Sequence, residues 1–178
     1  KDIDKRNGFS IFFIDSHTKG VSMTPQNIAT VAPENQYNVY FDDAMIPKEC
    51  LIGEENKGFS YIFSALNVER IIVSAIALGF GRFVLDKGVK YAKERKITEE
   101  PIGAYQGIQH MLSRAKVDLE LADLASQKAA ELYDDDVESG VVGMYANMAK
   151  LAGGEAAYKA CDAAMQVHGG YCIDKDYD

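Results

Sequence analysis

The chain has 178 residues, of which 47% are hydrophobic and 26% are charged, and its formal net charge is −8. This size and composition indicate a soluble globular chain of one or two domains. The negative charge excludes a general affinity for nucleic acid. The longest uncharged apolar run, Ile71 to Gly81, is too short for a membrane span, which needs about 20 residues. The scattered histidines and cysteines lack metal-ligand spacing, so we expect no metal site.

Strand patterns dominate the beginning of the chain. Residues 9–14 form a short apolar run, and residues 21–24 form a brief one that ends at a proline. Residues 36–41 alternate polar and apolar side chains, which is typical of a half-buried strand. The polar, glycine-bounded segment 53–58 then predicts a loop. We therefore expect a short antiparallel β segment that ends at this loop.

Three long helices are predicted after the loop, over residues 59–93, 106–133 and 141–167. Long helices joined by short loops favour an antiparallel bundle of the four-helix type. The expected fold class is therefore α+β and mainly α, with a fourth helix expected beyond the last residue. We divide the chain into a β part over residues 1–52 and a helical bundle over residues 53–178.

The first predicted helix carries a long apolar stripe. Between residues 71 and 81 this helix is apolar on all sides, which argues for a central, buried position. The stripe consists of Phe59, Ile62, Phe63, Leu66, Val73, Ile76, Ala77, Phe80 and Val84. The second helix has a stripe of Ile108, Met111, Leu112, Ala115, Leu119, Ala122 and Ala129. The third helix is rich in alanine, which permits close helix packing.

Glu69 and Arg70 fall on the apolar stripe of the first helix, three and four residues after Leu66. Burying a charge without a partner is costly, so their position needs a reason. One interpretation is a local ion pair, or a place at the edge of the stripe. The other is a carboxylate held in an apolar cleft as a general base, with an arginine nearby for an anionic ligand.

Several short sequence blocks occur in an order that is known from one protein family. They are Phe41-Asp-Asp-Ala-Met-Ile-Pro47, Leu51-Ile-Gly-Glu54, Gly58-Phe59, Leu66-Asn-Val-Glu-Arg-Ile71, Ala92-Lys-Glu-Arg-Lys96, Pro101-Ile102, Gln106-Gly-Ile-Gln109 and Gln166-Val-His-Gly-Gly-Tyr171. No block is specific alone, but the ordered set resembles the acyl-CoA dehydrogenases. The resemblance implies that residues 1–52 end a middle β domain. It also implies that residues 53–178 supply three of the four helices of a carboxyl-terminal bundle, with the last helix missing.

The resemblance implies flavin-dependent α,β-dehydrogenation of an acyl-CoA thioester, in which a carboxylate removes the α-proton and a hydride passes to N5 of FAD. A subset of the family carries this glutamate in a Glu-Arg pair on the first bundle helix, which Glu69 matches. Many other members carry it in a segment after the third bundle helix, outside this chain. Arg70 would lie near the CoA moiety, and Asn67 would line the same cleft. The alternative for Arg70 is an ion pair with Glu54, Glu55 or another acidic residue.

The resemblance also predicts contacts to FAD, which the family holds with the bundle of a neighbouring subunit. The matching residues are Arg95, Gln106, Gln166, Gly169 and Gly170. Arginine suits a diphosphate because its guanidinium donates hydrogen bonds as a fork. The alternatives are that Arg95 is a solvated helix-end charge and that Gly169 is a simple helix cap. Glu99 and Glu100 replace a glycine and a basic residue of the family pattern, so this loop departs from it.

The implied partners are an acyl-CoA substrate, an electron-transfer flavoprotein or another acceptor, and further copies of the chain in a homodimer or homotetramer. The implied location is the cytoplasm or the mitochondrial matrix. A second hypothesis is a non-catalytic relative that binds CoA esters or partners, and the Thr98-Glu99-Glu100 departure motivates it. A third is a helical assembly module without a ligand, which gives no reason for the Glu69–Arg70 pair on an apolar stripe.

Overall fold

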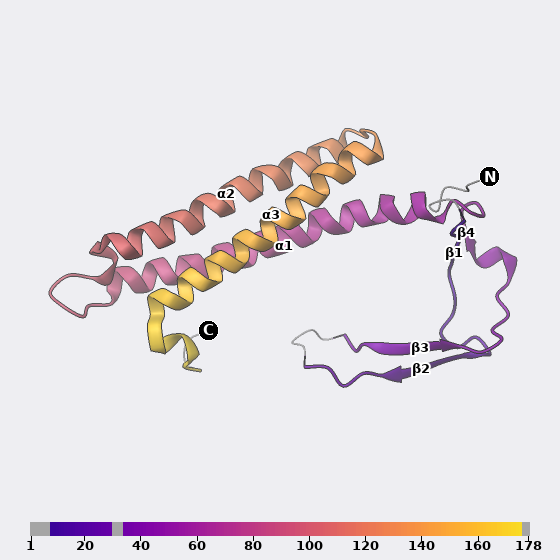
Figure 1. Cartoon of the computed structure of the whole chain (residues 1–178), viewed down its shortest axis with the longest axis horizontal. Helices are drawn as coiled ribbons and strands as arrows, with labels where there is room; N and C mark the ends of the chain where they lie inside the picture. The colour runs from indigo at the N-terminus through magenta and orange to yellow at the C-terminus, as the bar shows by residue number, and fades with distance from the viewer. Residues whose placement is uncertain (1–7, 30–33, 176–178) are drawn as a thin grey trace. The chain divides into compact units, whose positions relative to one another are not determined.

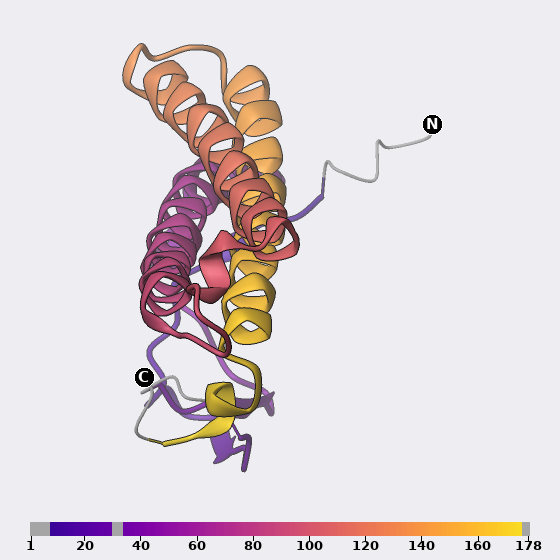
Figure 2. The same cartoon turned by 90° about the vertical axis from the view of Figure 1, so that its left-hand side faces the viewer.

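The computed structural model describes residues 8–29 and 34–175, and Figures 1 and 2 show the ribbon from two directions. Short strands precede long helices, in the predicted order. The described chain packs as two compact units that divide between Ile62 and Phe63. None of the described helices combines the length and the apolar character that crossing a membrane would need.

The division between the two units lies later in the chain than the domain boundary predicted at 52/53. The first helical turn packs with the β unit, because the Gly58 N–H donates to the Phe9 carbonyl at 2.8 Å. The rings of Phe9 and Phe59 also lie 6.1 Å apart. The extent of a domain in a longer protein is a separate question, so the boundary at 52/53 stays a prediction.

The β unit contains two small antiparallel sheets. Its strands are β1 (Ile11–Phe12), β2 (Val21–Pro25), β3 (Tyr37–Phe41) and β4 (Leu51–Ile52). Strand β1 pairs with β4, and β2 pairs with β3. All five residues of β3 are exposed, so the prediction of a half-buried strand is wrong. Strand β4 was not predicted, because two residues are too few to show an alternating pattern.

The helices match the predicted ranges closely. They are α1 (Gly58–Glu94), α2 (Gln106–Asp134) and α3 (Ser139–His168). Helix α3 begins with a side-chain cap, in which the Glu138 carboxylate accepts hydrogen bonds from the N–H groups of Gly140 at 2.9 Å and Val141 at 3.1 Å. It ends at Gly169, whose φ of 60° is unfavourable for other residues.

Helices α1 and α3 run parallel and very close together. A Cβ atom added at Gly81 would lie 3.1 Å from the Cα of Ala157. Seven residues further along both helices, a Cβ at Gly88 would again lie 3.1 Å from the Cα of Ala164. Because the two contacts follow in the same order along α1 and α3, the two helices run in the same direction. Glycine and alanine at the crossing let the two backbones approach each other.

Helix α2 runs antiparallel to both. A Cβ atom added at Gly81 would contact Leu119, and one added at Gly88, further along α1, would contact Leu112. Because Leu112 comes before Leu119 in α2, the two helices run in opposite directions. In Figures 1 and 2 the three helices lie side by side along most of their length. The predicted antiparallel bundle is confirmed for these three helices.

Each helix packs through residues that alternate at spacings of three and four, as in coiled-coil packing. On α1 this packed face contains Asn67, Ser74, Leu78, Gly81, Leu85, Gly88 and Ala92. On α2 it contains Leu112, Ala115, Leu119, Ala122, Ser126 and Ala129. On α3 it contains Val142, Ala146, Ala149, Gly153, Ala156, Ala160, Ala163 and Val167. The α2 stripe agrees with the prediction, because Ile108 and Met111 are partly buried against the same core, and only Ser126 was not predicted.

The predicted stripe of α1 is largely the wrong face. Ile76 is 66% exposed and Phe80 is 57% exposed, whereas Leu78 between them and Ser74 just before them are almost completely buried. Because residues 71–81 are apolar on all sides, hydrophobicity alone does not point toward the core. The small residues of α1 do indicate the buried side. Helix α3 presents an alanine surface, and it can approach α1 closely only where the α1 side chains are small. In the described chain, α1 is therefore buried on one face only.

Candidate functional site

Glu69 lies at the amino-terminal end of an exposed apolar face of α1. The spacing of three or four residues places it in line with Ile72, Ile76, Phe80 and Phe83, on the side of the helix away from the packed face. These four side chains are 53%, 66%, 57% and 54% exposed, and Glu69 is exposed as well. The described chain thus presents one carboxylate on a continuous apolar surface. We refer to these five residues as the Glu69 face.

Asn67 lies on the opposite side of α1 from Glu69. It is only 3% exposed, and its Nδ2 donates a hydrogen bond to the Ser139 carbonyl at 3.0 Å. A Cβ at Gly143 would lie 3.1 Å from its Oδ1, so Asn67 fits tightly against the first turn of α3. The structure does not bring Asn67 together with Glu69, and its contacts here tie α1 to α3.

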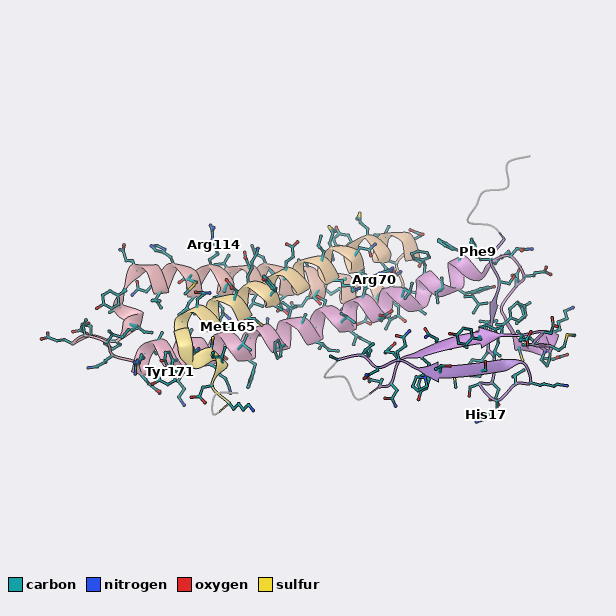
Figure 3. The ribbon with its side chains drawn as sticks, turned by 60° about the horizontal axis from the view of Figure 1, so that its bottom comes forward. Phe9, His17, Arg70, Arg114, Met165 and Tyr171 are labelled. Atoms are coloured by element: carbon teal, nitrogen blue, oxygen red, sulfur yellow. The ribbon has the colours of Figure 1, made fainter. Side chains whose placement is uncertain are left out.

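Arg70 is half-buried beside Asn67 (Figure 3). Its Nη1 donates to the Oδ1 of Asn67 at 3.3 Å, and its guanidinium carbon lies 5.5 Å from the centre of the Phe63 ring. Arg70 makes no ion pair with a carboxylate of the described helical unit, residues 63–175, and the alternative of a pair with Glu54 or Glu55 stays a prediction. An arginine without a carboxylate partner remains able to bind an anion.

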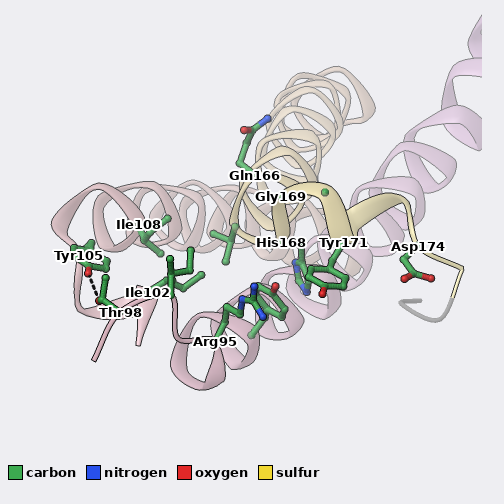
Figure 4. Close-up of a pocket in the computed structure, with 14 residues that line it drawn as sticks. Arg95, Thr98, Ile102, Tyr105, Ile108, Gln166, His168, Gly169, Tyr171 and Asp174 are labelled. Atoms are coloured by element: carbon green, nitrogen blue, oxygen red, sulfur yellow. Dashed lines mark hydrogen bonds between the residues drawn. The ribbon is translucent and has the colours of Figure 1, made fainter. Parts of the chain in front are cut away.

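A pocket of about 860 Å³ lies at the carboxyl-terminal ends of α1 and α3 (Figure 4). The loop between α1 and α2 and the 3₁₀ helix η3 (Gly169–Ile173) complete its wall. Its lining includes four of the five residues predicted to contact FAD, namely Arg95, Gln166, Gly169 and Gly170. Gln106, the first residue of α2, is not among the lining residues. Residues that are distant in sequence therefore meet at one cavity, although their roles stay predictions.

Two glycines of the pocket wall differ in what they require. Gly169 ends α3 with a positive φ of 60°, so a helix cap accounts for this glycine, and its contact with FAD stays a prediction. Gly170 has no such backbone requirement, and a Cβ built there would meet no atom within 4 Å. The protein's own packing therefore does not explain the glycine. Its missing side chain instead leaves space open in the pocket.

The loop after Arg95 is held in place at its base. The Arg95 carbonyl accepts a hydrogen bond from the Ile102 N–H at 2.8 Å. The Thr98 and Tyr105 hydroxyl groups are hydrogen-bonded at 2.7 Å, and both residues line the pocket. Glu99 and Glu100 are exposed and do not belong to the lining. The acidic departure from the family pattern therefore does not place a carboxylate in the pocket wall.

Sequence reasoning missed the aromatic residues of the pocket. Tyr91 lies one helical turn before Arg95, and Tyr171 follows the two glycines, and both line the cavity. The spacing of four residues from Arg95 could have revealed Tyr91, because residues four apart share a helix face.

A smaller apolar pocket of about 210 Å³ shares the lining residue His168 with the large one, and its lining includes Cys161 and Cys172. Burial raises the pKa of the Cys161 thiol, so this group is a poor nucleophile at neutral pH.

The described residues contain no group of three or more histidines, cysteines and carboxylates that could hold a metal ion.

Comparison with known proteins identifies the family. Residues 56–178 match the family model for the carboxyl-terminal domain of acyl-CoA dehydrogenases. The chain is 42% identical over 168 residues to the acyl-CoA dehydrogenase FadE12 of Mycobacterium tuberculosis, and the match covers 94% of this chain and 43% of the relative. It is 34% identical over 172 residues to a caffeyl-CoA reductase–Etf complex subunit, CarC, of Acetobacterium woodii, over 96% of this chain and 44% of that protein.

Solved structures give the same result. The butyryl-CoA dehydrogenase of Megasphaera elsdenii superposes with a TM-score of 0.87 at 27% identity, over 98% of this chain and 45% of that one. The chain spans less than half the length of these relatives. The resemblance read from the sequence blocks is therefore confirmed, and this chain, whose residues 56–178 match the carboxyl-terminal domain, belongs to the acyl-CoA dehydrogenase family.

Proposed function

We propose that this chain forms part of a flavin-dependent enzyme that oxidises an acyl-CoA thioester to its α,β-unsaturated product. The observation that carries the proposal is the Glu69 face. A carboxylate at the end of this apolar surface has no structural benefit there, since it adds a charge to a face that could otherwise pack against apolar groups. It does have a chemical use, because an acyl chain lying on that face would bring its α-carbon to a base.

Glu69 acts in this proposal as the base that accepts the α-proton. An acyl chain lying against Ile72 and Ile76 displaces water from the surroundings of the carboxylate, and a carboxylate that has lost water is a stronger base. Arg70, one residue further along the helix, offers a cation for the phosphate groups of CoA. We assign Asn67 a supporting role, since its amide holds α3 and its Oδ1 accepts from Arg70 at 3.3 Å.

The pocket at the ends of α1 and α3 is proposed to bind FAD. Its chemistry fits a dinucleotide: Arg95 donates to a diphosphate, the Gln166 amide hydrogen-bonds polar edges, and Gly170 leaves room for close approach. Arg95, just after α1, is 26 residues beyond Glu69, which is about 39 Å of helix, so flavin held in this pocket would supply the hydride acceptor at the Glu69 of a neighbouring copy of the chain. Gln106 lies next to the lining residue Tyr105, so its proposed contact requires a ligand that extends beyond the pocket.

The same residues also serve the reverse reaction. A base that removes the α-proton in one direction returns it in the other, and the CarC relative is named as a reductase subunit. We propose the oxidative direction because FadE12, the more similar of these two relatives, is named a dehydrogenase. The name of CarC also supports an electron-transfer flavoprotein as the redox partner. The non-catalytic alternative stays open, because Thr98 of the departing segment lines the pocket although Glu99 and Glu100 do not.

A homodimer or homotetramer is also proposed. Large apolar side chains lie on the outer faces of two helices, with Leu121 and Leu124 on α2 and Met148 and Leu151 on α3. Burying such residues between copies removes apolar area from water. Light scattering on the full-length protein at micromolar concentration tests this, and a clean monomer contradicts it. The location in the cytoplasm or mitochondrial matrix stays a prediction.

The function itself is tested on the purified full-length protein. We expect it to copurify with FAD, and we expect a set of saturated acyl-CoA thioesters to include one that bleaches the flavin absorbance without oxygen. Colourless protein that does not take up added FAD contradicts the cofactor assignment. Flavin that no saturated thioester reduces, but that an enoyl-CoA oxidises after chemical reduction, assigns the reductive direction instead.

A further inference from the structure

Two pairs of side chains connect the end of α1 to the junction of α3 and η3. Figure 4 labels Arg95, His168 and Tyr171 of these pairs. In the first pair, the rings of Tyr91 and His168 stack with their centres 4.2 Å apart and their planes inclined by 27°. In the second, the guanidinium carbon of Arg95 lies 5.5 Å from the centre of the Tyr171 ring. All four residues line the large pocket. The cation that faces the pocket is therefore already in contact with an aromatic ring.

The backbone explains why the two pairs form together. Tyr91 and Arg95 are four residues apart on one side, and the Arg95 N–H still donates to the Tyr91 carbonyl at 2.8 Å. On the other side, the Nδ1 of His168 lies 2.7 Å from the Ala164 carbonyl, so this nitrogen carries the proton and the ring is fixed. The positive φ of Gly169 then turns the chain so that Tyr171 reaches Arg95.

An arginine side chain has many rotamers, and ordering it when a ligand binds costs conformational entropy. An aromatic ring in cation–π contact with the guanidinium, as Tyr171 is with Arg95, restricts these rotamers beforehand and leaves the N–H groups that point away from the ring able to donate. Preorganisation of this kind increases affinity by reducing the cost of binding. The Tyr91–His168 stack fixes the two segments that carry Arg95 and Tyr171.

We propose that Tyr171 is a positioning residue that holds Arg95 in the orientation required by a dinucleotide diphosphate. The proposal rests on the proposed binding of FAD in this pocket. Tyr171 was not among the residues predicted to contact the cofactor. The proposal couples its effect on FAD affinity to that of Arg95. Tyr171 contributes to affinity through Arg95, so its contribution disappears when Arg95 is removed.

A double-mutant cycle on the full-length apoprotein tests the coupling, with FAD affinity measured by the quenching of flavin fluorescence on binding. Tyr171→Leu is expected to weaken FAD binding by about three- to tenfold, and Tyr171→Phe, which keeps the ring, by less than about twofold. In an Arg95→Ala background, Tyr171→Leu should produce no further loss. Tyr158→Leu, at an exposed tyrosine of α3 away from the pocket, is the matched control and should bind normally.

The outcomes separate this proposal from the function on which it rests. Unchanged affinity in Tyr171→Leu, or an equal loss in both backgrounds, overturns the positioning role while FAD binding by the wild type stands. A wild-type apoprotein that does not bind FAD removes both. Circular dichroism confirms that each variant keeps its helices. Should Tyr171→Leu not fold, Arg95→Lys keeps the charge without the planar face, and wild-type affinity in that variant also overturns the proposal.

Discussion

The two faces of α1 differ in a way that runs against the usual relation between hydrophobicity and burial. The packed face contains Asn67, Ser74, Gly81 and Gly88, which are small or polar residues, and all of them are buried. The exposed Glu69 face carries isoleucine and phenylalanine. The difference indicates that the packed face serves close contact with α3. The Glu69 face remains available for a ligand or for other parts of the protein.

The largest expected effect on the stability of the fold comes from adding volume to the packed face. Gly81→Val places a branched side chain where a single Cβ would already lie 3.1 Å from the Cα of Ala157. Moving the backbones apart should lower the free energy of unfolding by about 3 kcal/mol. Gly79→Val is the matched control, because no atom lies within 4 Å of a Cβ there and the expected change is less than about 0.5 kcal/mol. Urea denaturation of the two variants measures the difference, and equal stabilities would disprove the tight α1–α3 contact.

A smaller effect is expected from removing the buried amide of the packed face. Asn67→Ala leaves the Ser139 carbonyl without its hydrogen bond of 3.0 Å and should lower the free energy of unfolding by about 1–3 kcal/mol. Asn147→Ala, at an exposed position of α3, should cost nothing. If Asn67→Ala keeps full stability but raises the KM for acyl-CoA, Asn67 is a substrate residue, as the sequence resemblance implied.

The sequence was sufficient to predict the extent of the helices but not which face of α1 is buried. The ends of α3 could be predicted because glycines and polar residues that favour helix ends flank it. The packed face of α1 could not, because its direction depends on the alanine surface of α3, which approaches closely only after folding. The pocket shows the same limit. Arg95 and Gln166 were named from the resemblance, whereas the contact between Arg95 and Tyr171 depends on the turn at Gly169.

The smallest effect on the stability of the fold is expected from a substitution on the exposed Glu69 face. Ile76 is 66% exposed, so Ile76→Ser should change the free energy of unfolding without ligand by less than about 0.5 kcal/mol. The apparent affinity for acyl-CoA should fall, because an apolar contact for the acyl chain is lost. Chemical denaturation and substrate titration together measure both quantities. A loss of stability of about 2 kcal/mol or more would show that this face is packed inside the protein.

The role of Glu69 is the central claim, and the reduction of flavin by substrate tests it most directly. Glu69→Gln keeps the size of the side chain and removes the basic oxygen. In stopped-flow experiments on the full-length protein, the rate of flavin reduction by acyl-CoA should fall by at least about 10²- to 10⁴-fold. Flavin content and substrate binding should remain, and Glu155→Gln, at an exposed position of α3, should react normally. A near-normal rate in Glu69→Gln would contradict the assignment and would place the base outside this chain.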